Sequence, residues 1–185
     1  MYKRQLTISA GATSGTFNVP VLADTTDENN ETATITLSNA SNATISDSTA
    51  TLTITDDDAA PSLSIADVTT SNENAANSGF TINHSAVSGK DITVDYATSN
   101  GTATAGSDYI ATSGTFTFSA GETTKSFNVP VLADTTDENN ETATITLSNA
   151  SNATISDSTA TLTITDDDAA PSMTCLLYTS DAADD

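Results

Sequence analysis

The chain has 185 residues, of which 25 are acidic and 4 are basic, and its formal net charge is −21. The phosphates of nucleic acid and anionic membrane surfaces repel such a chain, so neither is expected as a partner. No apolar run approaches the roughly 20 residues that a membrane-spanning helix needs, and no direct membrane insertion is expected.

The two ends of the sequence differ in character from the rest. We interpret residues 1–5 and 173–185 as translated sequencing adaptor, because MYKRQ and CLLYTSDAADD back-translate to the two orientations of one adaptor. The single cysteine, Cys175, lies in the second of these segments and carries no redox information. The fold is therefore expected to reside in residues 6–172.

A tandem repeat organises this region. Residues 17–62 are identical to residues 127–172, which gives a period of about 110 residues. The boundaries that follow are the C-terminal half of a module at 6–58, a linker at 59–61, a complete module at 62–168 and a second linker at 169–172. The half copy lacks the first three strands, so its apolar faces and sheet edges have no partner, and we expect it to be poorly ordered alone or to pair with another chain.

Apolar residues that alternate with Thr and Ser predict seven strands in the complete module. In chain order they are Ser62–Ile65, Gly79–His84, Asp91–Thr98, Gly114–Ser119, Thr124–Leu132, Glu141–Ser148 and Ser158–Thr165. Turn residues such as Asn100-Gly101 separate them, and no segment has a helical period of useful length. The prediction is an all-β fold, a seven-stranded antiparallel immunoglobulin-like β-sandwich.

Strand direction predicts where the charges gather. If each strand reverses direction, the connections after the first, third and fifth strands and the end of the seventh lie at one end of the sandwich. The opposite end holds Lys90 and Lys125 with only three acids, Asp91, Glu122 and Asp157. Ten acids fall at the first end: Asp67, Glu73, Asp108, Asp134, Asp137, Glu138, Glu141, Asp166, Asp167 and Asp168.

Such a cluster of carboxylates has a cost. Like charges about 4 Å apart repel by roughly 1 kcal/mol in water and about 4 kcal/mol at an effective dielectric constant near 20. Ca²⁺ suits the cluster, because it accepts carboxylate and carbonyl oxygens in irregular geometry; Mg²⁺ prefers fewer carboxylates and more water. There is no cysteine and no histidine near this end, so zinc or copper would be poorly served. The alternative is a solvated acidic end that only keeps the protein soluble.

Several motifs together resemble the Calx-beta family, which occurs in the regulatory loop of sodium–calcium exchangers and, in tandem, in large bacterial surface proteins. They are GTATAGSDY from Gly101, GTFTFSAGETTKSFNVPVLAD from Gly114, DENNET from Asp137 and TLTITDDD from Thr161. The resemblance implies a calcium cluster whose ligands are Glu73, Asp108, Asp134, Glu138, Glu141, Asp166, Asp167 and Asp168, with a backbone carbonyl from Thr136. The matching acids in the half copy are Asp24, Glu28, Glu31, Asp56, Asp57 and Asp58.

One departure from the family pattern concerns the number of ions. Ala133 and Thr135 stand where well-studied members carry acids, which implies about two ions at this end, or a weaker affinity. The half copy has no counterparts of Glu73 and Asp108, so its site is expected to be incomplete.

These inferences predict a calcium-binding repeat of a tandem extracellular array, secreted or at the cell surface and bacterial, that acts as a calcium-stiffened spacer or adhesion module. Its expected partners are neighbouring repeats in the same chain and, through other domains, a cell-surface or matrix ligand. The alternatives are a calcium-sensing module of a membrane protein, or a structural or carbohydrate-binding repeat in a secreted enzyme. No catalytic residues are expected, because His84 is the only histidine and no Ser–His–Asp set can be assembled.

Overall fold

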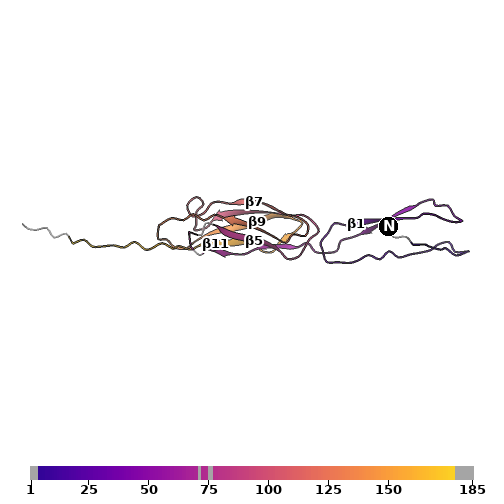
Figure 1. The fold of residues 1–185 in the computed structure, drawn as a ribbon, viewed down its shortest axis with the longest axis horizontal. Helices are drawn as coiled ribbons and strands as arrows, with labels where there is room; N and C mark the ends of the chain where they lie inside the picture. Colours follow the sequence, from indigo (N-terminus) through magenta and orange to yellow (C-terminus); the bar gives the residue numbers. More distant parts are fainter. Residues whose placement is uncertain (1–3, 71, 75–76, 178–185) are drawn as a thin grey trace, which may run out of the picture. The chain divides into compact units, whose positions relative to one another are not determined.

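The computed structural model describes residues 4–70, 72–74 and 77–177, and the regular structure in these residues is entirely β-strand (Figure 1). Contacts divide the chain into two units, Met1–Asp58 and Ala59–Asp185, which are described separately. The part of the chain described includes no helix with the length and apolar character required to cross a membrane.

The second unit is a sandwich of two sheets. One sheet has the order β10 (Thr154–Ile155), β3 (Ser62–Ile65), β5 (Ser78–His84) and β8 (Thr124–Val129). The other has the order β4 (Val68–Thr69), β11 (Thr159–Ile164), β9 (Glu141–Ser151), β6 (Ile92–Asn100) and β7 (Ser113–Phe118). The predicted all-β sandwich is confirmed.

The strand count differs from the prediction because the first strand is continued by β4 in the other sheet, and because a short strand, β10, forms before the last strand. After β3 the chain crosses to the other sheet, where β4 pairs in parallel with β11, while β10 pairs in parallel with β3. The Asp67 carboxylate holds this break against β11 by accepting a hydrogen bond of 2.7 Å from the Thr161 nitrogen. We expected Asp67 to lie with the other nine acids at one end of the sandwich. That expectation is wrong, because Asp67 lies beside Thr161 within β11.

Proline shortens one predicted strand. We predicted a strand through Leu132, but β8 ends at Val129, since Pro130 has no N–H to donate to the ladder. Val131 instead forms an isolated bridge with Tyr109. The connection between β8 and β9 consequently begins beside the connection between β6 and β7, which carries Tyr109.

Alternate residues of the strands fill the space between the sheets, as their period of two predicts. Phe80 and Val129 from one sheet and Ile145 from the other are fully buried. An aromatic cluster links the two sheets at Phe127 of β8, whose ring centroid lies 4.2 Å from that of Tyr96 on β6 and 5.6 Å from that of Phe80 on β5. The core is therefore formed jointly by early and late strands of the module.

His84, the only histidine in the sequence, packs at the end of β5. Its ring centroid lies 4.2 Å from that of Phe118, and neither ring nitrogen has a hydrogen-bond partner among the residues described. Burial lowers the pKa of His84, so the imidazole is held neutral. The half-buried His84 ring therefore contributes to packing at the end of β5.

The first unit contains a hairpin of β1 (Glu31–Thr36) and β2 (Thr49–Ile54). Its register repeats that of β9 and β11, since Thr32 faces Thr53 as Thr142 faces Thr163. Several side chains that are buried in the complete module are exposed here. Pairs of identical residues have exposed fractions of 46% and 8% (Phe17, Phe127), 44% and 0% (Val19, Val129), and 49% and 2% (Leu37, Leu147). These apolar side chains of the half copy are therefore exposed in the described part of the chain.

The identical residues allow a matched test of the core. Phe127→Ala should lower the free energy of unfolding of the complete module by about 3–5 kcal/mol, because it removes a buried ring between the sheets. Phe17→Ala should change it by less than about 0.5 kcal/mol. Urea denaturation of the two variants, which have the same composition, would measure the difference. Equal losses would contradict the burial described here.

Candidate metal centre

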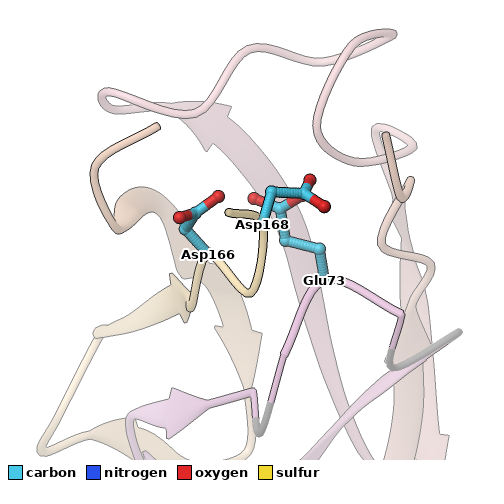
Figure 2. Close-up of side chains that lie close together, drawn as sticks. All are labelled: Glu73, Asp166 and Asp168. Atoms are coloured by element: carbon cyan, nitrogen blue, oxygen red, sulfur yellow. The ribbon is translucent and has the colours of Figure 1, made fainter. Parts of the chain in front are cut away.

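Carboxylates from four separate segments meet at one end of the sandwich, here called the acidic end. The segments are the connections between β4 and β5, β6 and β7, and β8 and β9, and the residues that follow β11. In a first group, carboxylate oxygens of Glu73, Asp166 and Asp168 lie within 4.8 Å of one another (Figure 2). In a second group, oxygens of Asp108, Asp134 and Glu138 do the same.

The first group joins the segment after β4 to the segment after β11. Figure 2 shows Glu73 reaching from the former towards Asp166 and Asp168 on the latter. Two hydrogen bonds of 2.9 Å fix the segments to each other, from the Thr165 nitrogen to Thr70 Oγ1 and from Thr165 Oγ1 to the Thr70 carbonyl. The side chain of Glu73 is thereby held in a position where the residue is only 8% exposed.

The second group depends on how the connection after β6 lies against β9. A Cβ at Gly101 would lie 2.4 Å from the Thr142 carbonyl oxygen, so only glycine permits this approach. The Thr142 nitrogen donates to Thr102 Oγ1 at 2.7 Å, and its carbonyl accepts from the Ala103 nitrogen at 2.9 Å. These contacts bring the loop that carries Asp108 to the start of β9.

Tyr109, next to Asp108, anchors the same loop. It is fully buried, and its hydroxyl donates to Asn100 Oδ1 at 2.7 Å. The Asp108 carboxylate accepts from the Thr104 nitrogen at 2.6 Å, and the Asp108 carbonyl accepts from the Leu132 nitrogen at 2.9 Å. Tyr109 and the two contacts of Asp108 therefore hold this loop against the sandwich.

A turn in the connection between β8 and β9 presents the remaining acids. Asp134 Oδ1 accepts from the Thr136 nitrogen at 2.6 Å, so an aspartate side chain closes the turn. The Glu138 nitrogen donates to Asp166 Oδ1 at 3.3 Å, and the Asp166 nitrogen donates to Asn140 Oδ1 at 3.1 Å. The turn that contains Thr136, the predicted carbonyl ligand, is therefore tied to the segment that follows β11.

Glu141, the first residue of β9, couples the two groups electrostatically. Burial raises its pKa to about 7, and further causes are a side-chain hydrogen bond with Asp108 and the charges of Asp108, Glu138 and Glu73. These neighbours come from both groups. The ionised form of Glu141 is consequently destabilised by acids of both groups.

Burial and charge repulsion also raise the pKa values of other carboxyl groups at the acidic end. The pKa values of Glu73, Glu138 and Asp168 are raised, first by burial and then by neighbouring carboxylates. Asp168 Oδ2 is buried and has no hydrogen-bond partner among the described residues. A buried polar atom without a partner is costly, and a charged one more so. A hard cation among these oxygens would relieve both the repulsion and the missing contact.

Asp167 differs from the other predicted ligands. Both of its carboxylate oxygens accept from Asn74 Nδ2, at 3.0 and 3.3 Å, and it belongs to neither of the two groups. Its contact ties the segment after β11 to the residue that follows Glu73. We did not predict positioning roles for Asn74 and Asn140; the only sequence signal for either was its place beside a predicted ligand, Glu73 or Glu141.

The acids of the half copy are less closely grouped than those of the complete module. The predicted ligands of the half copy line one depression: Asp24, Glu28, Glu31, Asp56, Asp57 and Asp58. Across the residues described in this unit, no three acids have oxygens as close together as in the two groups of the acidic end. The pKa of Asp58 is raised, first by burial and then by neighbouring aspartates. The half copy lacks a counterpart of Glu73 from the first group and of Asp108 from the second.

These features define an immunoglobulin-like β-sandwich whose acids are gathered in the loops at one end. The model of the Calx-beta domain family matches residues 1–58 and 56–168. The chain therefore belongs to the Calx-beta domain family, and the predicted resemblance is confirmed.

Solved structures resemble the chain in fold, and some of them also in sequence. The apo-form Calx CBD1 domain is 26% identical with a TM-score of 0.55, and the match covers 58% of this chain and 98% of that one. The calcium binding domain CBD12 of CALX1.1 is 27% identical with a TM-score of 0.54, covering 57% of this chain and 46% of that one. The Calx CBD2 domain, at 15% identity and a TM-score of 0.51, shares the fold. A comparison with curated protein sequences gave no match.

The raised pKa of Glu141 predicts an unusual pH dependence in the presence of chelator. Above pH about 7 the ionised carboxylate destabilises the folded module, and this loss is relieved as the pH falls from about 7 towards the ordinary value of 4.5. In that window the folded state binds a proton that the unfolded state does not. Thermal unfolding from pH 8 to 5 should therefore show a smaller gain in Tm on acidification for Glu141→Gln than for the wild type.

The control is Glu122→Gln at the opposite end, where hydrogen bonds from Lys125 and the Ser119 nitrogen lower the pKa of the carboxyl group. The contribution of Glu122 to stability has the opposite pH dependence, because its carboxylate stabilises the folded state and this stability is lost on acidification. Glu122→Gln should therefore not reduce the gain in Tm. A gain in Glu141→Gln equal to that of the wild type would contradict the assignment.

Proposed function

We propose that the complete module binds calcium at its acidic end, and that it serves as a calcium-stiffened spacer or adhesion module of a tandem extracellular array. The observation that carries the calcium proposal is the convergence of two groups of three carboxylates from four segments, with Glu141 coupled to both. Ca²⁺ takes about 6–8 oxygens, which three carboxylates, a backbone carbonyl and water can supply. With one ion in each group, the module would bind two calcium ions.

The donor set favours calcium over other metals. Both groups consist of carboxylates, without the imidazole or thiolate ligands that zinc and copper prefer. Six carboxylates with a seventh beside them exceed what Mg²⁺ usually takes from a protein. A solved relative with 27% identity is itself described as a calcium binding domain, which supports the same assignment for this chain.

Bound calcium would act on the direction in which the chain leaves the module. Asp166 and Asp168 lie just before the predicted linker at 169–172, and a carboxylate oxygen of Glu73 lies within 4.8 Å of theirs, so an ion between them would join the two segments. The first strand begins at the opposite end of the sandwich, because Ser62 pairs with Thr154 while Ile164 pairs with Glu141. In a tandem chain, an ion at each acidic end would therefore restrict the bending of the linker that follows it.

Calcium binding is tested by thermal unfolding of the chain with millimolar calcium and with chelator. Binding to the folded state alone stabilises it by about 2.7 kcal/mol per site when the ion is 100-fold above its Kd, so Tm should rise with calcium. Asp134→Asn combined with Glu138→Gln removes two members of the second group and should lose most of the rise. Asp91→Asn combined with Glu122→Gln makes the same charge change at the opposite end and should retain it. An identical Tm with calcium and with chelator in the wild type would eliminate the proposal.

The spacer role requires a separate measurement. A chain of three successive copies of residues 59–168 should show a larger maximum dimension and a narrower range of dimensions by small-angle scattering in calcium than in chelator. The Asp134→Asn/Glu138→Gln change in every copy should remove this difference. If calcium raises Tm but leaves the scattering unchanged, the module binds calcium without stiffening an array.

A further inference from the structure

The connection between β6 and β7 follows Asn100-Gly101, the only Asn-Gly pair in the sequence. In such a pair the glycine nitrogen can attack the asparagine side chain with little hindrance, because glycine has no side chain and its backbone is permissive. Asn100 and Gly101 are both exposed, so water reaches them. The pair is therefore a chemically labile position at the start of the loop that carries Asp108.

The structure holds the Asn100 side chain in place. Asn100 Oδ1 accepts two hydrogen bonds, one of 3.0 Å from the Ala105 nitrogen and one of 2.7 Å from the Tyr109 hydroxyl. Tyr109 is fully buried, so its hydroxyl is a fixed donor. Attack by the Gly101 nitrogen requires Asn100 Cγ to move onto that nitrogen, and the two hydrogen bonds oppose this movement. The reaction therefore requires the loop to open.

The same loop carries a member of the second carboxylate group. Asp108 lies next to Tyr109 in sequence, and its carboxylate lies within 4.8 Å of oxygens of Asp134 and Glu138. Asn100 holds one end of the loop by hydrogen bonds. An ion in the second group would hold the other end through Asp108, and would so reduce the fraction of molecules in which the loop is open.

We propose that Asn100 is a site of deamidation, that the closed loop suppresses the reaction, and that bound calcium suppresses it further. The Gly101 nitrogen bonds to Asn100 Cγ and gives up its proton, the bond from Cγ to Nδ2 breaks, and ammonia leaves. Water then opens the resulting succinimide ring at either carbonyl, which gives aspartate or isoaspartate with no change in oxidation state. The control by calcium rests on the proposed function, whereas suppression by the closed loop does not.

The two products differ in their effect on the loop. Aspartate retains an oxygen that can accept from Ala105 and Tyr109. Isoaspartate adds a methylene group to the main chain beside Gly101, where even a Cβ would collide with the Thr142 carbonyl oxygen. The isoaspartate product must therefore displace the loop, and Asp108 with it, from β9. A module kept without calcium would gradually and irreversibly lose its second carboxylate group.

The test follows deamidation at Asn100 in the full 185-residue chain by peptide mass spectrometry, at a temperature well below the Tm in chelator. Calcium at about 100-fold its Kd should slow the reaction at least about tenfold relative to chelator, because it binds only the closed loop. Asp134→Asn combined with Glu138→Gln should remove this difference. Asp91→Asn combined with Glu122→Gln, at the opposite end, should retain it.

A second comparison tests the closed loop without calcium. In chelator, Tyr109→Phe removes one donor to Asn100 and should speed deamidation about fivefold, whereas Tyr96→Phe, which removes a hydroxyl elsewhere on β6, should change it less than about twofold. The chain unfolded in urea gives the rate without a loop and should react faster than any folded variant. The Tm of each variant shows whether it is folded at the temperature of the measurement.

The consequence for the site is tested on aged protein. Chain kept in chelator until Asn100 has reacted should show a smaller rise in Tm with calcium than fresh chain, while Asn100→Asp should keep the full rise. An undiminished rise in the aged chain would contradict displacement of the loop by isoaspartate.

The outcomes separate this proposal from calcium binding itself. A rise in Tm with calcium but equal deamidation in calcium and chelator would overturn the calcium control and leave calcium binding intact. Equal Tm in calcium and chelator would eliminate both calcium binding and the calcium control. A rate in the folded wild type equal to that in urea, or a folded Tyr109→Phe variant that reacts no faster than Tyr96→Phe, would overturn suppression by the closed loop.

Discussion

The mutual repulsion of carboxylates is the constraint around which this module is arranged. The two sheets bring together acids that are more than 90 positions apart in sequence, such as Glu73 and Asp168, and the resulting proximity raises the pKa values of several of them. The repulsion is opposed by a core in which early and late strands interlock at Phe80, Tyr96 and Phe127. Two hydrogen bonds between threonine hydroxyls and the backbone, at Thr70 and Thr165, then fix the charged segments within reach of one another. The protein thus spends part of its stability on holding these carboxylates close together.

The duplicated sequence separates what local pattern determines from what tertiary packing determines. The hairpin register is the same in both copies, with Thr32 facing Thr53 as Thr142 faces Thr163, so strand pairing between neighbours follows from the sequence itself. Burial does not follow in the same way, because Phe17 and Phe127 differ only in the strands available to pack on them. An alternating pattern therefore identifies the apolar face of a strand, and a second sheet decides whether that face is buried.

Much of the fold could be predicted from sequence, because period-two patterning and turn residues are local signals. The end of the sandwich that holds Glu73, Asp108 and Asp166 followed from strand direction alone, without side-chain geometry. The transfer of the first strand between sheets at Asp67 could not be foreseen, since it depends on a hydrogen bond to Thr161, far along the chain. The same holds for the engagement of Asp167 by Asn74. These contacts join residues that become neighbours only after the sheets have packed.

The divided first strand has a mechanical consequence. β3 pairs in parallel with β10, and β4 pairs in parallel with β11. The N-terminal strands of the module are therefore bonded to its C-terminal strands in both sheets. A force that draws the chain ends apart would load these parallel backbone hydrogen bonds together, in shear along the strand axis, rather than peel them one at a time. The Asp67 contact with Thr161 lies between the two pairings and would bear part of the same load. The topology therefore provides resistance to traction at the two chain ends of the module.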